Sequence, residues 1–230
     1  EKPVNILSEK QTNTKRTMPD ILKKMSGAYE VDTIHRLDKM VGGTMVYSIS
    51  RKATSVLSKM VRDHKLTKEY LAVVTGKPEE ESGEMCDILF KDSKKNKSFV
   101  IKTMRKGAKD AKLEYTTLAT KDNNGTEVSL VKIRLHTGRT HQIRVQFSHR
   151  KMPLLGDGKY GSERKNKQFG ETSGQALYSY KLTFTFTTDE VDGDETIVSV
   201  NYKNLHNEMQ PGGEITVCNG MVKFEVVEVK

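Results

Sequence analysis

Two β-prone runs joined by a short polar turn constrain the fold of this chain more than any other local feature. Leu113–Thr120 is followed by the turn Asp122–Gly125 (DNNG) and then by Glu127–Leu135. In the second run, valine, isoleucine and leucine alternate with lysine and arginine, the period-two pattern of a half-buried strand. Asn and Gly tolerate the left-handed conformation of tight turns. The segment therefore predicts an antiparallel hairpin.

The remaining elements extend this prediction to a whole domain. A helix is expected at Arg51–Lys65 after a Ser50 cap, and a second from a Thr140 cap to about Arg150, where Pro153 stops it. Further strands are expected at Thr44–Ser50, Tyr70–Thr75, Phe99–Met104 and Ala176–Thr187, with a terminal hairpin at Ile215–Val229 around Asn219-Gly220. Strands outnumber helices, which predicts an α+β protein with a mainly antiparallel mixed sheet and flanking helices.

Composition limits the classes of partner. The 230 residues are 35% hydrophobic and 30% charged, as expected of a globular chain with a real core. No apolar run approaches the roughly 20 residues that cross a bilayer, so no membrane partner is expected. There is no secretory signal, and Cys86 and Cys218 are the only cysteines. A reducing compartment is expected, namely the cytoplasm, or an organelle in a eukaryote.

Positive charge is concentrated in two segments. The formal net charge is +9, and Lys91–Lys112 and Arg134–Lys167 each hold nine Lys or Arg against two acids, a net +7 apiece. Lysine and arginine gain by displacing counterions from phosphates. Two solvated basic faces would give the same composition. RNA contact is the preferred interpretation, because the second segment also contains the densest motif in the chain.

Three motifs could carry chemistry. In His35–Lys39 (HRLDK) an Asp is flanked by cations that favour its ionised form, so it could act as nucleophile or base, although five residues alone would also suit a surface ion pair. Lys68-Glu69-Tyr70 opens a strand with a Tyr that is either half-buried core or a partner for a base. Thr137–Arg144 (TGRTHQIR) places His141 and Arg144 three residues apart, hence on one helical face.

Together these motifs resemble the RluA-type family of RNA pseudouridine synthases. HRLDK, KEYLAVVTGKP, GAKDAKLEY, HTGRTHQIRVQF, PLLGDGKYG and ALYSYKLTF occur in the family's order, over residues 1–187. The resemblance implies the pseudouridine synthase catalytic-domain fold in residues 1–190. It also implies isomerisation of a specific uridine in structured RNA, ribosomal RNA or tRNA, by a monomer. No metal and no small-molecule cofactor are expected, and the histidines show no metal-ligand spacing.

The resemblance also assigns roles to residues. Asp38 resembles the nucleophile, Tyr70 the Tyr that stacks on the target base and assists deprotonation at C5, and Arg144 the Arg that pairs with the Asp. Leu154 and Leu155 resemble the apolar floor of the base pocket. The residues implied in RNA contact are His35, Arg36, Arg139, His141 and Gln142.

Two parts of the chain depart from the family pattern. HRLDK continues with Met40–Gly43 (MVGG) where the family has D-T-S-G, so a polar pair beside Asp38 is lost. The strand that normally precedes the family's N-K-P, here Glu1–Pro3 (EKP), is absent, so the first strand of the sheet is expected to be missing. Residues 191–230 are expected to form a C-terminal β extension, and PGGEITVCNGMVKFEV within them is similar to the lid domain of plastid-type pyruvate kinases.

Two other functions compete with the synthase. A non-catalytic RNA-binding protein of the same fold would keep the basic segments without needing the Asp–Tyr–Arg trio, and all three residues are present. A pyruvate-kinase-related protein would need the barrel that holds the phosphoryl-transfer site, and no such sequence occurs. Release of the C5 hydrogen of uridine distinguishes the synthase from both.

Overall fold

A computed structural model describes all 230 residues except 13, 15, 124, 171–173, 184, 188–196, 200–204, 218–221, 227–228 and 230. The chain divides into two compact units, Glu1–Thr183 and Phe184–Lys230. The helices of the first unit are α1 (Met18–Ser26), α2 (Arg51–Arg62), α3 (Gln142–His149) and α4 (Glu163–Lys167). Its strands are β1 (Asp32–Thr33), β2 (Gly42–Gly43), β3 (Tyr47–Ser48), β4 (Thr67–Thr75), β5 (Ser82–Asp92), β6 (Lys97–Ile101), β7 (Ala108–Asn123), β8 (Thr126–Leu135) and β9 (Leu177–Thr183).

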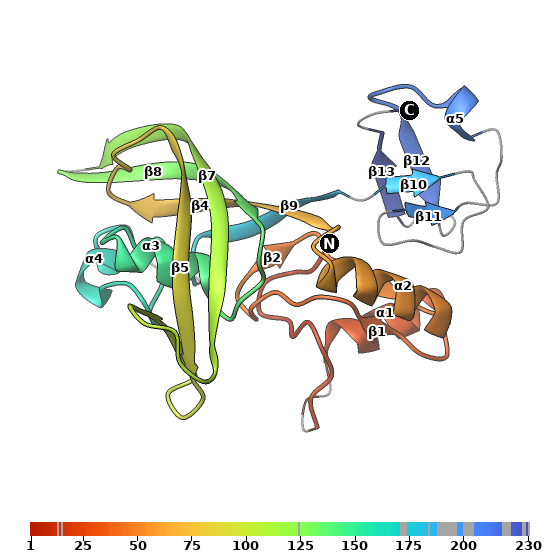
Figure 1. Ribbon diagram of the computed structural model, residues 1–230, viewed down its shortest axis with the longest axis horizontal. Coiled ribbons are helices and arrows are strands. Elements are labelled where there is room, and N and C mark those ends of the chain that lie inside the picture. Colours follow the sequence, from red (N-terminus) through yellow and green to blue (C-terminus); the bar gives the residue numbers. More distant parts are fainter. Residues whose placement is uncertain are drawn as a thin grey trace. The chain divides into compact units, whose positions relative to one another are not determined.

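A seven-stranded sheet organises the first unit (Figure 1). Its strand order is β2-β9-β4-β8-β7-β5-β6, and every neighbouring pair is antiparallel except β2 and β9. This confirms the predicted class, an α+β protein with a mainly antiparallel mixed sheet. The hairpin predicted from alternation is β7–β8, in which Leu113 pairs with Leu135 and Asn123 with Thr126.

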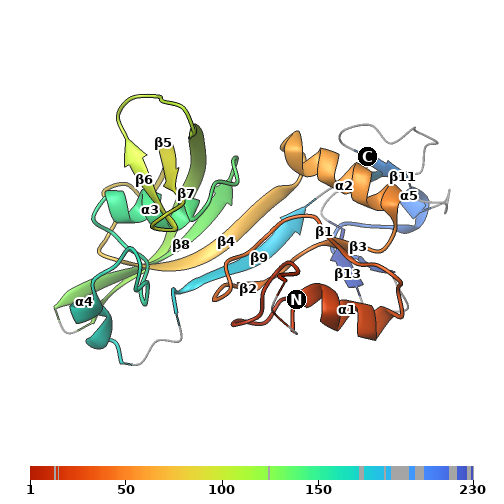
Figure 2. The ribbon, with the colours of Figure 1, turned by 90° about the horizontal axis from the view of Figure 1, so that it is seen from below.

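The core forms where α3 lies against one face of this sheet, near β5 and β6 (Figures 1 and 2). Alternation along β4 sends Tyr70, Ala72 and Val74 to that face, because successive side chains of a strand point to opposite sides. Ile143 and Phe147 of α3 pack on them, and Phe147 is fully buried. The contact fixes the position of α3, and with it the helix start that carries TGRTHQIR.

Local signals predicted some elements well and missed others. Ser50 caps α2 as expected, accepting a hydrogen bond from the Ala53 amide at 3.3 Å. The predicted Thr140 cap is wrong, because α3 begins at Gln142 with His141 in the capping position. The apolar stripe of α2 is only half buried apart from Met60. Neither α1 nor β5 was predicted, and β5 is a strand because it pairs with β7 along nine residues, despite its acids and Gly83.

The second unit contains short elements, which are β10 (Thr185–Thr187), β11 (Ile197–Ser199), α5 (Leu205–Glu208), β12 (Glu214–Val217) and β13 (Val222–Glu225). β12 and β13 form the antiparallel pair predicted at the C-terminus, with Ile215 opposite Phe224. Their connecting Asn219-Gly220 and the predicted domain boundary near residue 190 lie outside the described residues. The likeness of this tail to a pyruvate kinase lid stays a prediction.

A chain that ends at Thr188 is expected to fold. The first unit contains the whole seven-stranded sheet and both clusters of buried apolar residues that line its core. Its urea unfolding, followed by far-ultraviolet circular dichroism, should remain a single cooperative transition, because cooperativity depends on that shared core. The full chain is the control. Loss of cooperative unfolding in the shortened chain would show that residues 189–230 are integral to the core.

Candidate active site

A cleft of about 860 Å³ opens between the loop 35–41, the start of α3 and the beginning of β4. Eight of the ten predicted site residues line it, and these are His35, Arg36, Asp38, Tyr70, Arg139, His141, Gln142 and Arg144. The structure therefore brings together motifs that are more than 100 residues apart in sequence.

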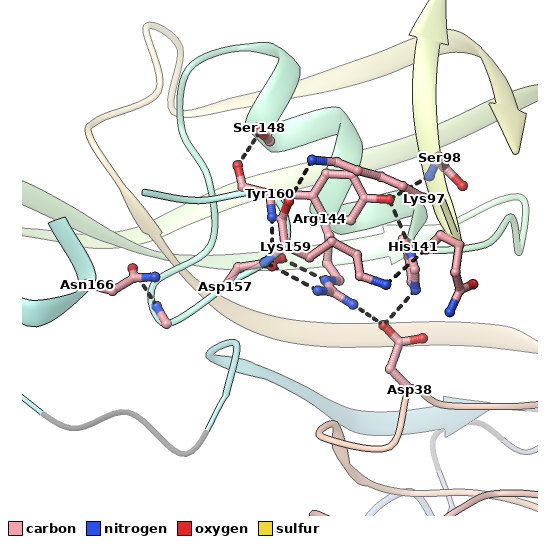
Figure 3. Close-up of polar contacts among 12 residues, drawn as sticks. Asp38, Lys97, Ser98, His141, Arg144, Ser148, Asp157, Lys159, Tyr160 and Asn166 are labelled. Atoms are coloured by element: carbon pink, nitrogen blue, oxygen red, sulfur yellow. Dashed lines mark hydrogen bonds and ion pairs between the residues drawn. The ribbon is translucent and has the colours of Figure 1, made fainter. Parts of the chain in front are cut away.

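Arg144 is the centre of the polar contacts in this cleft (Figure 3). Its Nε and Nη2 donate to the two carboxylate oxygens of Asp157 at 2.7 and 2.8 Å, and its Nη1 donates to Asp38 Oδ2 at 2.7 Å. The predicted Arg144–Asp38 ion pair is therefore confirmed. Burial by itself would lower the pKa of Arg144, but the two carboxylates outweigh it and raise the pKa, so the guanidinium is always charged.

Asp157 binds Arg144 on the side that faces the interior, away from Asp38. Its carboxylate is fully buried and also accepts the backbone amides of Lys159 and Tyr160 at 2.9 and 3.0 Å. Burial opposes its ionisation, yet the bonds from Arg144 and from these amides lower its pKa. A charge-assisted fork of this kind fixes the plane of a guanidinium. The third arm of Arg144 is thereby aimed at Asp38, whose side chain is 32% exposed.

Buried polar contacts brace the loop that carries Asp38. Lys2 is fully buried, and its ammonium donates to the carbonyls of Pro3, Ile6 and Lys39 at 2.9, 2.8 and 3.1 Å. Burial lowers the Lys2 pKa to about 8, although the nearby Asp38 charge opposes that shift. The Val41 amide closes the turn on the Asp38 carbonyl at 2.9 Å. The Asp38 backbone is thus tied to the N-terminal segment.

The MVGG departure leaves the path of this loop intact. Val41 is buried in the core, and Gly42–Gly43 forms β2 beside β9. Gly43 has φ +122, and a Cβ there would lie 2.1 Å from the Ser179 carbonyl oxygen. Only glycine fits this approach. Whether the loss of the polar pair weakens hydrogen bonds beside Asp38 is not tested by these contacts.

His141 lies beside Arg144, as their spacing predicted. Its Nε2 is 3.8 Å from Asp38 Oδ2, and its Nδ1 is 2.9 Å from the Tyr160 hydroxyl (Figure 3). His141 has φ 55, a left-handed conformation that costs a non-glycine residue energy. The ring is 9% exposed, and burial lowers its pKa, with Arg144 and Lys159 adding to the shift and Asp38 opposing it.

Tyr70 forms an apolar wall of the cleft. It is 5% exposed and belongs to the main core cluster. Burial raises its pKa to about 12, and the Asp38 charge adds to this. Its hydroxyl is therefore protonated at neutral pH, and a role in deprotonation at C5 stays a prediction.

Two of the predicted RNA-contact residues, His35 and Gln142, are buried and already hydrogen-bonded within the protein. His35 is buried, and its Nε2 accepts the Val46 amide at 3.1 Å. Burial lowers the His35 pKa to about 4, so the ring is neutral. Gln142 is buried too: its amide oxygen accepts from Thr137 and from the Arg139 backbone, and its amide nitrogen donates to a backbone carbonyl. Both side chains hold the protein's own backbone in this structure.

The two arginines at the mouth of the cleft are more open. Arg36 is 59% exposed and pairs with Glu9 at 2.5 Å. Arg139 donates its Nε to the Asp110 carbonyl at 2.7 Å, which leaves its other donors for solvent or a ligand. The exposed face of the cleft is therefore positive.

Leu154 and Leu155 are not brought to this cleft. Leu154 is fully buried in the core and bridges Val74, and the Leu155 amide bonds to the Val73 carbonyl at 2.8 Å. Neither lines the cavity. The pair secures the 153–161 loop to β4, and a place under a bound base stays a prediction.

Three residues of the site were not singled out from the sequence. These are Lys2, Asp157 and Tyr160. The available signal was an acid between two glycines, with a Tyr three residues later, in PLLGDGKYG. Within the described part of the chain no group of three or more His, Cys, Asp and Glu could hold a metal ion. Among the same residues no helix is long and apolar enough to cross a bilayer.

Comparison with known proteins gives a consistent result. A family model described as RNA pseudouridylate synthase matches residues 1–149. An uncharacterized RNA pseudouridine synthase of Aquifex aeolicus (strain VF5) is 32% identical over 189 residues, which are 78% of this chain and 58% of that protein. A tRNA pseudouridine synthase C of Vibrio parahaemolyticus is 29% identical over 170 residues, covering 69% and 68%.

A further relative and a solved structure agree. The ribosomal large subunit pseudouridine synthase D of Borreliella burgdorferi is 32% identical over 149 residues, 65% of this chain and 43% of that protein. The chain spans about half the length of the first curated relatives it matches. Human RNA Pseudouridylate Synthase Domain Containing 1 has the same fold, with a TM-score of 0.65 at 21% identity over 79% of this chain and 71% of the other.

Replacing Asp157 by Asn should destabilise the protein strongly. The change leaves the Arg144 charge, 8% exposed, without its buried counter-ion, and breaking such a pair costs about 3–5 kcal/mol of unfolding free energy. Glu84→Gln is the control, since Glu84 pairs with Lys112 and the two side chains are 52% and 42% exposed. There the loss should be much smaller, because an exposed ion pair contributes little to stability. Equal losses in urea unfolding would contradict the central role of the Asp157 pair.

Proposed function

The chain belongs to the RNA pseudouridylate synthase family, and on that premise we propose that it isomerises a uridine of structured RNA to pseudouridine with Asp38 as nucleophile. One observation carries the assignment. Arg144, itself held by the buried Asp157, fixes one oxygen of a partly exposed Asp38 carboxylate at the cleft. A protein that only bound RNA would have no need for a carboxylate in its cleft, where it would repel the phosphates of RNA.

The geometry supports a division of labour within the Asp38 carboxylate. Oδ2 accepts the Arg144 bond, and Oδ1 has no hydrogen bond from any of the described residues. We therefore assign the reactive lone pair to Oδ1. In the reaction the uracil N1–C1′ bond breaks and a C5–C1′ bond forms. The proton on C5 leaves and N1 gains one, so the atoms balance without an external reactant, and the carboxylate is regenerated.

The target base must leave its stack to reach this carboxylate, which costs a few kcal/mol in a duplex and less in a loop. Tyr70 is the aromatic wall on which we place the flipped uracil. Its high pKa favours stacking and hydrogen-bond donation over proton abstraction by a phenolate. Arg36 and Arg139, at the positive mouth, are proposed to hold the neighbouring phosphates.

The substrate class follows from the family and from charge. Relatives are named for tRNA and for large-subunit ribosomal RNA, and we propose one of these for this chain. Such RNA would be met in the cytoplasm, or in an organelle of a eukaryote. The cleft is built from one copy of the chain, so we propose that the protein acts as a monomer.

Asp38→Asn should abolish pseudouridine formation while leaving RNA affinity within a few-fold. An amide is a poor nucleophile, whereas its size and its place beside Arg144 are nearly unchanged. The measurement is release of tritium from RNA that carries C5-tritiated uridine, with affinity measured separately by filter binding. Glu30→Gln is the control, because it removes the same charge at an exposed site outside the cleft. Substantial release by the Asp38 variant would refute the nucleophile assignment.

RNA affinity should fall steeply with salt, because each neutralised phosphate contributes roughly 0.7–0.9 to the slope of log affinity against log salt. Lys91 and Lys95 are exposed, and Lys91 lines the cleft. Their double replacement by Gln should reduce the slope by about 1.4–1.8 if each holds a phosphate. Replacing the exposed Lys24 and Lys121, which lie outside the cleft, should change it little. Equal changes in both pairs would remove these lysines from the interface.

A further inference from the structure

His141 is held more tightly than an RNA-contacting surface histidine needs to be. It occupies a left-handed backbone conformation at the start of α3, with φ 55, and its ring is 9% exposed. Such backbone strain costs of order 1–3 kcal/mol and persists where the surroundings over-determine it. The ring edge packs against the Tyr160 ring at 5.6 Å between centroids. The backbone, the burial of the ring and its contact with Tyr160 therefore all fix the orientation of the His141 imidazole.

The hydrogen bonds around Tyr160 favour one tautomer of the His141 ring. The Ser98 backbone amide donates to the Tyr160 hydroxyl oxygen at 2.7 Å, and the Ser98 hydroxyl is committed to the Thr140 carbonyl at 2.8 Å. The Tyr160 proton is then free for His141 Nδ1, 2.9 Å away. Burial raises the Tyr160 pKa, so that proton stays on the phenol. With the phenol as donor, His141 Nδ1 accepts, and in the neutral ring the proton then lies on Nε2.

Burial and the neighbouring cations disfavour protonation of the ring. Burial lowers the His141 pKa most, and Arg144 and Lys159 lower it further, while Asp38 and Asp157 oppose the shift. Lys97 adds another positive charge, with its ammonium 4.9 Å from the Tyr160 ring centroid. The ring lines the cleft with its Nε2 3.8 Å from Asp38 Oδ2, too far for a hydrogen bond to that oxygen, so a neutral Nε2–H is left to serve a ligand.

We propose that His141 is a catalytic residue whose neutral Nε2–H donates a hydrogen bond to the uracil oxygen that becomes negative as the N1–C1′ bond breaks. Tyr160 is the positioning residue that sets the tautomer. The inference rests on the proposed synthase function. As the bond breaks, its electron pair passes to the uracil ring, and the imidazole shares its proton without transferring it.

Chemistry explains why a neutral donor suits this step. An imidazolium is acidic enough to protonate the released base, which would quench the anion that must attack C1′ through C5. A neutral imidazole is a far weaker acid and can only stabilise the charge, a use of histidine known in enolising enzymes. Arg144 is committed to another task, because three of its five N–H groups donate to Asp157 and Asp38.

His141→Asn is the first test. Asn tolerates positive φ better than other residues, so the backbone is kept, but its shorter amide does not reach the Nε2 position. Loss of one donor to a developing oxyanion lowers kcat about 100-fold or more, and KM should stay within about 3-fold because ground-state binding is unchanged. His149→Asn, at the exposed far end of α3, is the matched control. A raised KM with unchanged kcat would reduce His141 to an RNA contact and overturn the proposal.

Tyr160→Phe and nitrogen-15 NMR of the His141 ring form the second test. In the parent protein at pH 7 the ring should show a protonated Nε2 and a bare Nδ1. Tyr160→Phe should mix the tautomers and move the acidic limb of the kcat profile to higher pH, since the Tyr160 bond favours the neutral ring. A protonated Nδ1 or an imidazolium at pH 7 would overturn the proposal. An inactive parent protein would instead refute the synthase function itself.

Discussion

The buried charge of Arg144 is the constraint on which the site depends. A guanidinium that is 8% exposed needs counter-charges, and it has two, from Asp157 and Asp38. One partner comes from the loop after α3 and the other from the loop before β2. Satisfying the charge therefore aligns three separate segments. Arg144 and one Asp38 oxygen are therefore held in place by hydrogen bonds, and the partly exposed Asp38 side chain faces the cleft.

The seven-stranded sheet holds the segments that carry these side chains at fixed positions relative to one another. β4 carries Tyr70 into the cleft near its start, and farther along it binds the 153–161 loop through Val74 and Leu154. β9 pairs with β4 on one side and, through Ser179, with Gly43 just after the Asp38 loop. The carboxylate and its arginine are thus mounted on neighbouring parts of one framework, which suits a mechanism that depends on sub-ångström placement.

Burial sorts the basic groups of the site into two kinds. Lys2, His35 and His141 all have lowered pKa values because burial disfavours their charged forms. Arg144 remains charged because two carboxylates offset its burial. The cleft therefore combines the fixed positive charge of Arg144 with histidines whose pKa values burial has lowered.

The sequence by itself determined the class of the sheet, the β7–β8 hairpin and the α2 cap. The pairing of Asp38 with Arg144 was implied by the resemblance of its motifs to a known family. These depend on alternation, capping chemistry and motifs that are legible along the chain. Only the tertiary structure decided that β5 is a strand, that Gln142 and His35 serve the backbone, and that Leu154 lies in the core away from the cleft. It also decided that Asp157 and Tyr160 complete the site. Such outcomes depend on which distant backbone groups and charges meet in space, and local residue patterns do not encode that.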